Sequence, residues 1–232
     1  MLHVLNHCRT TMTTWVPTAY RTHTLNELQA NGADLLDTEV TVIGFMEANR
    51  GKGAICFVDL RDGTGKAQVF LKADNVGEKA LDTVQRLTRE STVQFTGTVA
   101  LKRPPKVKEG EPTPPPTYEV IASSVNIIAR AEAPLPLGVT DNVKVELDTR
   151  LDNRFLDLRR AHVNAMFRLR GKVLQFGREH LIEEGFIETH TPKIVATATE
   201  GGADLFPMQY FDRPAFLNQS PQLFKQLCMS GG

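Results

Sequence analysis

Two alternating segments joined by a tight turn place the strongest constraint on how this chain folds. Segments 55–61 and 66–72 each alternate along their length, and Asp62-Gly63-Thr64-Gly65 between them is typical of a turn. Successive strand residues point to opposite faces, so this pattern predicts a β-hairpin with one buried face. The side chains predicted to point inward are Cys56, Val58, Leu60, Ala67, Val69 and Leu71.

The segments around this hairpin complete the element order of a small barrel. Further strands are predicted from Val40, over 92–101 and over 118–129, with a short amphipathic helix over 78–89. Three strands, a helix and two strands are the order of an OB-fold. We therefore predict a five-stranded OB-fold barrel over residues 21–130.

Two segments of the N-terminal half fall outside the predicted strands. Six of the 13 prolines lie between Pro104 and Pro116. Proline has no backbone N–H for a strand ladder, so residues 102–117 are predicted to form a loop with a basic first half, whose role stays open. Residues 1–20 contain no Asp or Glu and are predicted to be a flexible leader; whether they are a targeting sequence is also open.

The periodicity changes after a predicted linker, or hinge, over 131–150. Apolar residues then recur at three- and four-residue steps, which predicts an amphipathic helix from about 158 to 184, with Gly185 as its stop. Short strands are predicted over 186–189 and 215–218, and a helix from Pro221. The predicted class is thus β plus α/β: a complete barrel followed by the first part of a second domain, residues 151–232.

The outer face of the predicted hairpin has the composition of an RNA-binding surface. It includes Phe57, Arg61, Gln68 and Lys72. An aromatic ring can stack on an unpaired base, an amide can read a base edge, and cations attract phosphate. The same residues allow a purely structural interpretation, in which Phe57 packs under the flanking loops and Arg61 pairs with Asp59 or Asp62.

Composition excludes several other classes of protein. The chain has 27 basic and 27 acidic residues, so it is not a strongly basic, histone-like binder. No run approaches about 18 apolar residues, so no membrane span is predicted. The cysteines at 8, 56 and 228 lack metal-site spacing, and so few scattered thiols indicate an intracellular protein, which we expect to be cytoplasmic.

Four segments of the C-terminal half carry a resemblance to a known family. Together they resemble class II aminoacyl-tRNA synthetases, and within that class the aspartyl-tRNA synthetases of the archaeal and eukaryotic style. The resemblance covers residues 21–232 apart from the proline-rich loop. It implies an anticodon-binding OB-fold barrel followed by the beginning of an antiparallel-sheet catalytic domain. The segments are Leu147–Arg159, Gly185–Pro192, Glu200–Phe206 and Phe216–Gln226.

The resemblance also implies roles for single residues in amino-acid recognition. Glu200 is expected near the substrate ammonium, Gln222 on the α-amino group and Lys225 on the side-chain carboxylate. Ser220, Leu223 and Phe224 complete the expected amino-acid-binding segment. A fixed cation suits aspartate and has no use in an asparagine-specific relative, so Lys225 favours aspartate.

The remaining implied roles concern tRNA and a second subunit. Phe57 matches a position that stacks on an anticodon base and Gln68 one that reads a base edge. Arg61 and Glu132 are further expected anticodon contacts. Pro192 is expected at a homodimer interface.

The implied reaction is ATP-dependent attachment of L-aspartate to tRNA(Asp) through an aspartyl-adenylate. ATP and Mg²⁺ would serve the whole enzyme. The family's phosphate-gripping arginines and Mg²⁺-binding acids have no counterpart in this sequence, so no catalytic residue is assigned. We expect the chain to be the front part of such an enzyme, inactive by itself.

Two alternatives stay open at the level of the sequence. One is the asparaginyl relative, and the other is a noncatalytic RNA-binding protein that uses only the barrel. Discrimination between tRNA(Asp) and tRNA(Asn) also stays open.

Overall fold

The computed structural model describes residues 20–104, 114–139, 143–196 and 206–232. The chain divides into two compact units, residues 1–159 and 160–232. Residues 1–19 of the predicted leader and residues 105–113 of the proline-rich loop lie outside the described residues.

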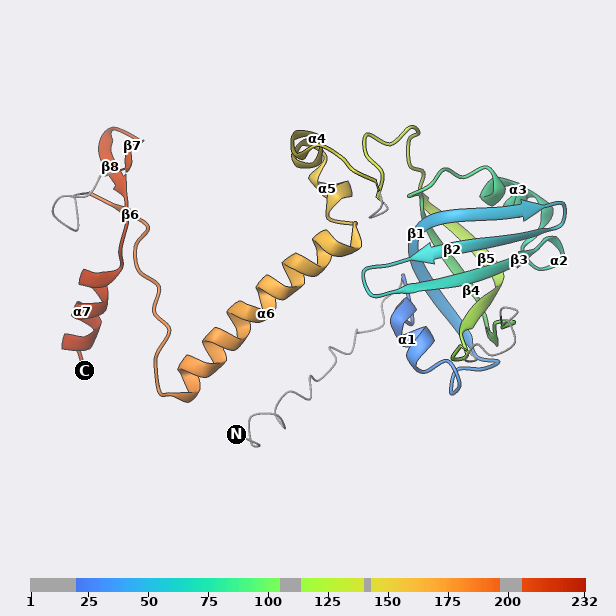
Figure 1. Cartoon of the computed structure of the whole chain (residues 1–232), viewed down its shortest axis with the longest axis horizontal. Coiled ribbons are helices and arrows are strands. Elements are labelled where there is room, and N and C mark those ends of the chain that lie inside the picture. The colour runs from blue at the N-terminus through green and yellow to red at the C-terminus, as the bar shows by residue number, and fades with distance from the viewer. Residues whose placement is uncertain (1–19, 105–113, 140–142, 197–205) are drawn as a thin grey trace. The chain divides into compact units, whose positions relative to one another are not determined.

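The first unit is built on a closed five-stranded barrel (Figure 1). The strand order is β1-β2-β3-β5-β4, and β1 and β4 pair to close it. The β3–β5 ladder is parallel and the other four are antiparallel. This arrangement confirms the predicted OB-fold. The strands are β1 (Glu39–Lys52), β2 (Ile55–Arg61), β3 (Lys66–Lys72), β4 (Thr92–Leu101) and β5 (Tyr118–Ala129).

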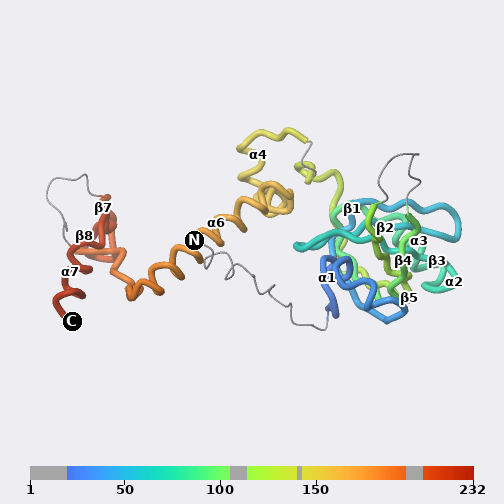
Figure 2. Tube along the Cα trace, turned by 60° about the horizontal axis from the view of Figure 1, so that its bottom comes forward, coloured from blue at the N-terminus to red at the C-terminus, as the bar shows by residue number. Residues whose placement is uncertain are grey.

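The barrel interior is filled by the apolar half of each alternating strand. All six side chains that the sequence analysis predicted to point inward are buried in one core. Helix α1 (Leu25–Ala30) adds Leu25 and Leu28 to that core, and α3 (Glu78–Gln85) adds Leu81 and Val84. In Figures 1 and 2, α1 lies at a different end of the barrel from α2 (Ala73–Val76) and α3. The helices therefore complete a core that the strands alone leave open.

Local chemistry explains where several elements begin and end. The four predicted ranges 55–61, 66–72, 92–101 and 118–129 match the observed strands. Strand β1 ends at Lys52, because Gly53 turns the chain at a φ of 61°. Helix α3 ends at Gln85, four residues earlier than predicted. The chain turns there toward Glu90, whose φ is 66°.

The segment after the barrel contains two short helices, α4 (Leu147–Asp152) and α5 (Arg154–Asp157). The fully buried Asp157 carboxylate holds them together, since it accepts from Arg150 Nε at 2.8 Å and also pairs with Arg154. The first unit continues to Arg159. It therefore includes the whole predicted linker and the first nine residues of the range 151–232.

The second unit begins with the long helix α6 (Ala161–Glu183). Gly185 has a φ of 84°, and its N–H donates to the Ile182 carbonyl at 3.0 Å. The N–H of Phe186 donates to the Leu181 carbonyl at 2.9 Å. These two bonds form a Schellman motif, the helix stop that the glycine predicted.

The small sheet of the second unit differs from the prediction. It contains β6 (Ile194–Val195), β8 (Arg213–Leu217) and β7 (Phe206–Tyr210), in that order, followed by α7 (Gln222–Ser230). The strand predicted at 186–189 is wrong, because this segment forms no backbone pairing with another strand among the described residues. The Glu188 carboxylate instead pairs with Arg178 on α6 at 3.0 Å. Strand β7 was missed because it contains Pro207, which an edge strand tolerates.

Candidate functional site

A pair of aromatic rings lies on the outer face of the barrel. Phe57 on β2 and Phe70 on β3 are partners across the hairpin ladder. Their ring centroids are 5.0 Å apart with the planes tilted by 35°. Both side chains are half-buried, so Phe57 is neither fully exposed nor sealed under loops. This leaves ring surface on the outer face, where a base could stack.

Polar groups follow the aromatic pair along the same two strands. Gln68 on β3 lies opposite Asp59 on β2. In the part of the chain that the structure describes, no protein group forms a hydrogen bond with the Gln68 amide. Its donor and acceptor therefore remain available to a ligand, as reading a base edge requires.

Gln68 also lines a groove of about 640 Å³. Asp59 and Lys66 lie on its hairpin side. Lys102 and Thr117 line it from the two ends of the proline-rich loop, where the Lys102 N–H donates to the Thr117 carbonyl at 2.9 Å. Lys66 is paired with Glu47 at 2.8 Å, so Lys102 is the lysine that, beside an unused amide, suits a polyanion that carries bases.

Glu119 is a candidate that sequence analysis missed. It is the second residue of β5 and the ladder partner of Gln68 in the parallel pairing with β3. Its Oε2 atom is buried without a hydrogen-bond partner among the described residues. Burial raises the pKa of this carboxyl, and the nearby Lys102 cation partly opposes the shift. Strand alternation already put Glu119 on the outer face, but only barrel closure brought it beside Gln68.

Arg61 has a different environment from the one expected. Its guanidinium pairs with Glu47 and Glu90, each at 2.8 Å, and its side chain is only 12% exposed. The sequence allowed Asp59 or Asp62 as its partner. Instead, Asp59 pairs with Arg50, and Asp62 caps its own turn and accepts from the Leu25 N–H. Arg61 is therefore an internal ion-pair partner rather than an open phosphate ligand.

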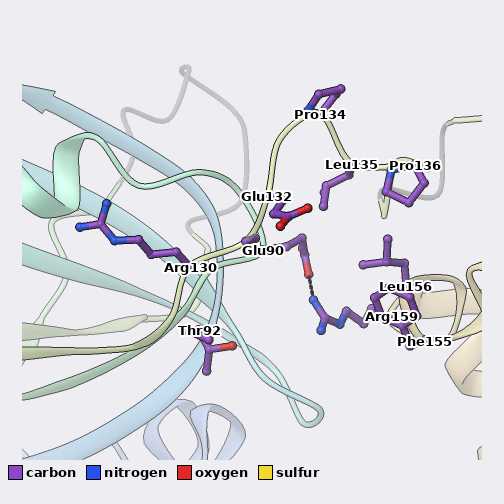
Figure 3. Close-up of a pocket in the computed structure, with 12 residues that line it drawn as sticks. Glu90, Thr92, Arg130, Glu132, Pro134, Leu135, Pro136, Phe155, Leu156 and Arg159 are labelled. Carbon is purple, nitrogen blue, oxygen red and sulfur yellow. Dashed lines mark hydrogen bonds and ion pairs between the residues drawn. The ribbon is translucent and has the colours of Figure 1, made fainter.

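Lys72 and Glu132, two further expected RNA contacts, lie away from Gln68 and do not line its groove. Lys72 pairs with Asp74 at the start of α2. Glu132 lines a separate pocket of about 400 Å³, together with Leu135, Phe155 and Arg159 (Figure 3). The structure thus brings Phe57 and Gln68 onto one hairpin face and places Glu132 elsewhere.

The expected amino-acid-binding segment forms the first turn of α7. Gln222 is its first residue, and its N–H donates to the Ser220 hydroxyl at 3.3 Å. The N–H groups of Leu223 and Phe224 belong to the first turn, which an α-helix leaves without internal acceptors. Such groups favour an anionic ligand such as a carboxylate.

Lys225 lies three residues after Gln222 on the same helix, so the two side chains share a face. Its own N–H donates to the Pro221 carbonyl at 2.9 Å, and its side chain is exposed. Glu200 lies outside the described residues. The exposed Pro192 accepts a hydrogen bond at its carbonyl from Asn218 Nδ2 at 3.1 Å, which ties it to the end of β8.

Two other kinds of feature, a metal site and a membrane span, have no candidate in the described ranges. Those residues contain no group of three or more His, Cys, Asp or Glu side chains that could hold a metal ion. Their helices are all too short or too polar to cross a membrane.

Family models match both halves of the chain. The model for OB-fold nucleic acid binding domains matches residues 40–128. The model for class II tRNA synthetases (D, K and N) matches residues 146–232. The first range contains the outer-face aromatic pair, and the second contains the α7 segment.

Curated relatives extend the similarity over most of the chain. It is 48% identical over 212 residues to the aspartate–tRNA(Asp/Asn) ligase of Methanosarcina barkeri, covering 91% of this chain and 46% of that protein. It is 44% identical over 212 residues to the aspartate–tRNA(Asp) ligase of Pyrococcus horikoshii, with the same two coverages. The chain spans about half the length of the curated relatives it matches.

Solved structures show the same architecture. A putative aspartyl-tRNA synthetase from Leishmania major matches with a TM-score of 0.77 and 28% identity, over 99% of this chain and 46% of that one. The asparaginyl-tRNA synthetase of Pyrococcus horikoshii, complexed with asparaginyl-adenylate, matches with a TM-score of 0.69 and 29% identity, over 85% and 43%.

Proposed function

Residues 40–128 belong to the OB-fold nucleic acid binding domains and residues 146–232 to the class II tRNA synthetases (D, K and N), and from this premise we propose that the protein attaches L-aspartate to tRNA(Asp). The barrel binds the anticodon, and the α7 segment contributes to the aspartate site. Curated relatives named aspartate–tRNA ligases over 91% of the chain support this assignment.

The observation that carries the RNA-binding part is the outer hairpin face. Phe57 and Phe70 supply ring surface, and Gln68 supplies an amide without a protein partner among the described residues. Stacking a base on an aromatic ring contributes about 1–3 kcal/mol. Lys66 and Lys102 flank the same groove, where phosphates of an anticodon loop would lie.

The α7 segment supports aspartate as the amino acid. Two carboxylates and one ammonium must be held in this substrate. The exposed Lys225 ammonium suits the side-chain carboxylate, and the Gln222 amide oxygen can accept from the α-amino group. We assign Glu200 to the same ammonium on the strength of the resemblance alone.

The contribution of these residues to catalysis is binding and orientation. Holding the reactants in one geometry accelerates their reaction without a covalent intermediate on the enzyme. ATP and Mg²⁺ belong to the implied reaction of the whole enzyme. Among the described residues, no group of three or more His, Cys, Asp or Glu side chains could hold a metal ion.

Assembly and location extend the proposal. We assign Pro192 to a homodimer interface, as the resemblance implies, and its exposure is compatible with that role. We place the protein in the cytoplasm, because Cys56 and Cys228 are both free thiols.

The asparaginyl relative is the second candidate function. It is favoured by the structural match to the asparaginyl-tRNA synthetase of Pyrococcus horikoshii. The Lys225 cation opposes it, because a neutral side-chain amide offers no charge to pair.

The test of the RNA-binding part is a titration of the 232-residue chain with anticodon stem-loops. A stem-loop carrying the aspartate anticodon should bind more tightly than the same stem with a scrambled loop. An asparagine stem-loop in a third titration shows whether the barrel separates the two tRNAs. Equal binding of the aspartate and scrambled loops would contradict the anticodon assignment.

A further inference from the structure

A line of alternating charges crosses the first unit. The Glu47 carboxylate accepts from Arg61 Nε at 2.8 Å, and Arg61 Nη2 reaches Glu90 Oε1 at 2.8 Å. The other oxygen of Glu90 accepts from Arg159 Nη1 at 2.9 Å. One carboxylate therefore holds two guanidinium groups, one from strand β2 and one from the end of the segment after the barrel.

Burial makes the central carboxylate the critical member of this line. The Glu90 side chain is 5% exposed, against 12% for Arg61 and 24% for Arg159. A charge removed from water needs opposite charges and hydrogen bonds to remain ionised. Glu90 has both, because each of its oxygens accepts from one arginine. Loss of either arginine would leave the buried carboxylate with one opposite charge instead of two.

The backbone around Glu90 holds its side chain toward the two arginines. Glu90 has a φ of 66°, which is uncommon for a residue with a side chain. Its N–H donates to the Met46 carbonyl at 2.8 Å, and the Met46 N–H donates to the Ser91 carbonyl at 2.9 Å. This pair of bonds anchors the turn to β1 just before a bulge between Met46 and Ala48. Such a bulge re-aims neighbouring side chains, and Glu47 lies in it.

Arg159 makes contacts beyond the ion pair. Its guanidinium carbon lies 3.8 Å from the centroid of the Phe45 ring on β1, a cation–π arrangement. Figure 3 shows the Glu90–Arg159 bond, with Phe155 and Leu156 of α5 beside the arginine. The segment after the barrel thus ends against the barrel wall.

The same turn also holds the beginning of that segment. The Ala131 N–H donates to the Ser91 hydroxyl at 3.1 Å, and the Ala131 carbonyl accepts from the Thr88 hydroxyl. Residues 88–91 therefore bind both ends of the stretch 131–159, although one end is 28 residues from the other.

We propose that Arg61, Glu90 and Arg159 form a clamp, named the Glu90 clamp, that holds residues 131–139 and 143–159 as a rigid part of the barrel unit. The sequence predicts a linker or hinge over 131–150, and the clamp holds the described residues of that range against the barrel. Glu90 acts as a positioning residue. Its ion pairs with Arg61 and Arg159 fix the position of Arg159, the last residue of the first unit. This inference does not depend on the proposed RNA or amino-acid ligands.

Hydrogen–deuterium exchange of the whole 232-residue chain tests the clamp. The N–H groups of Leu156, Asp157, Leu158 and Arg159 donate within the helical segment 153–159 and report its opening. Glu90→Gln keeps the side-chain shape and removes the charge. Exchange over 153–159 should become about 10- to 100-fold faster, the loss expected for a hydrogen bond between charged groups. Exchange in β2 to β5 should increase less, because only the Arg61 pair with Glu90 is lost there.

A second variant removes only the ion pair between Arg159 and Glu90. Arg159→Gln leaves the Glu90–Arg61 pair in place, so the barrel keeps its fold even where Glu90→Gln weakens it. It should speed exchange over 153–159 as Glu90→Gln does. Arg159→Lys keeps the charge and should restore part of the protection. Asp59→Asn is the matched control, since it removes an ion pair with Arg50 on the barrel surface and should leave 153–159 unaffected.

Two results would overturn the clamp. One is unchanged exchange over 153–159 in both Glu90→Gln and Arg159→Gln. The other is an equal increase in the barrel strands and in 153–159 for Arg159→Gln, which would make the arginine a general stability residue.

Discussion

Gln68 on β3 and Glu119 on β5 are ladder partners. The β3–β5 ladder is the parallel ladder of the barrel, and its two strands lie far apart in the sequence. Gln68 carries an amide and Glu119 a carboxyl group with a buried, unpartnered Oε2 among the described residues. Both belong to the outer face, next to the groove that Gln68 and Lys102 line.

Glu119 gives the protein a pH dependence of known sign. Burial raises its pKa in the folded state above the ordinary value of 4.5. Between the unfolded and folded pKa values the native state therefore binds more protons, so stability falls as pH rises through this window. Urea unfolding of wild type and Glu119→Gln from pH 4 to pH 8 measures the effect. The variant should lack this part of the fall, and identical profiles would contradict the assignment.

Phe57→Ala should weaken binding of an aspartate anticodon stem-loop. The ring lies on the outer face against Phe70, and loss of a base-stacking platform costs about 1–3 kcal/mol. Fluorescence titration at fixed salt measures the change. Phe186→Ala is the matched control, because Phe186 is an exposed phenylalanine of the second unit, outside this groove. Equal affinities of wild type and Phe57→Ala would remove the stacking role.

Arg61→Gln should affect stability and leave RNA affinity nearly unchanged. The guanidinium pairs with two carboxylates and is mostly buried, so its loss should lower the free energy of unfolding by about 1.5–3 kcal/mol. Urea unfolding and a stem-loop titration on the same preparation separate the two effects. Arg50→Gln, at an exposed ion pair, is the control for stability. A large loss of RNA affinity with unchanged stability would show that Arg61 contacts the RNA directly.

Thr24→Ala should loosen the start of α1. The Thr24 hydroxyl accepts from the Glu27 N–H at 3.2 Å, and the Glu27 carboxylate accepts from the Thr24 N–H at 2.8 Å, which together form a capping box. The change should lower the free energy of unfolding by about 1 kcal/mol, measured by urea titration at neutral pH. Thr83→Ala, at an exposed hydroxyl inside α3, should cost less.

The capping box has a pH signature opposite to that of Glu119. The hydrogen bond from the Thr24 backbone lowers the pKa of Glu27 below 4.5, against a smaller contribution from burial. Its stabilisation is complete above the unfolded pKa and is lost as pH falls through the folded pKa. A Glu27→Gln variant should therefore lose less stability on acidification than the wild type does.

Local patterns in the sequence predicted much of the barrel correctly. Alternation over 55–72 assigned the inward side chains, because a strand points successive residues to opposite faces. Gly185 predicted the end of α6, because only glycine takes a left-handed C′ position without steric cost. The strand predicted at 186–189 was wrong, since an extended segment becomes a strand only when another strand pairs with it.

The candidate site was predictable only in part. Phe57 and Gln68 lie on one face of a hairpin whose register follows from its four-residue turn. Glu119 and Arg61 needed the closed barrel, because their neighbours come from segments far away in the chain. Gln68 pairs with Glu119 only through the parallel β3–β5 ladder, and no local pattern signals that contact.

The sequence by itself determined most strands of the barrel, the long helix α6, which faces are apolar and which family motifs are present, because these depend on periodicity and neighbouring residues. Tertiary structure decided the partners of the charged groups. Arg61 pairs with Glu90, 29 residues away, rather than with Asp59 or Asp62. Barrel closure buried these groups, and a buried charge is held by whichever opposite charge the fold brings within reach.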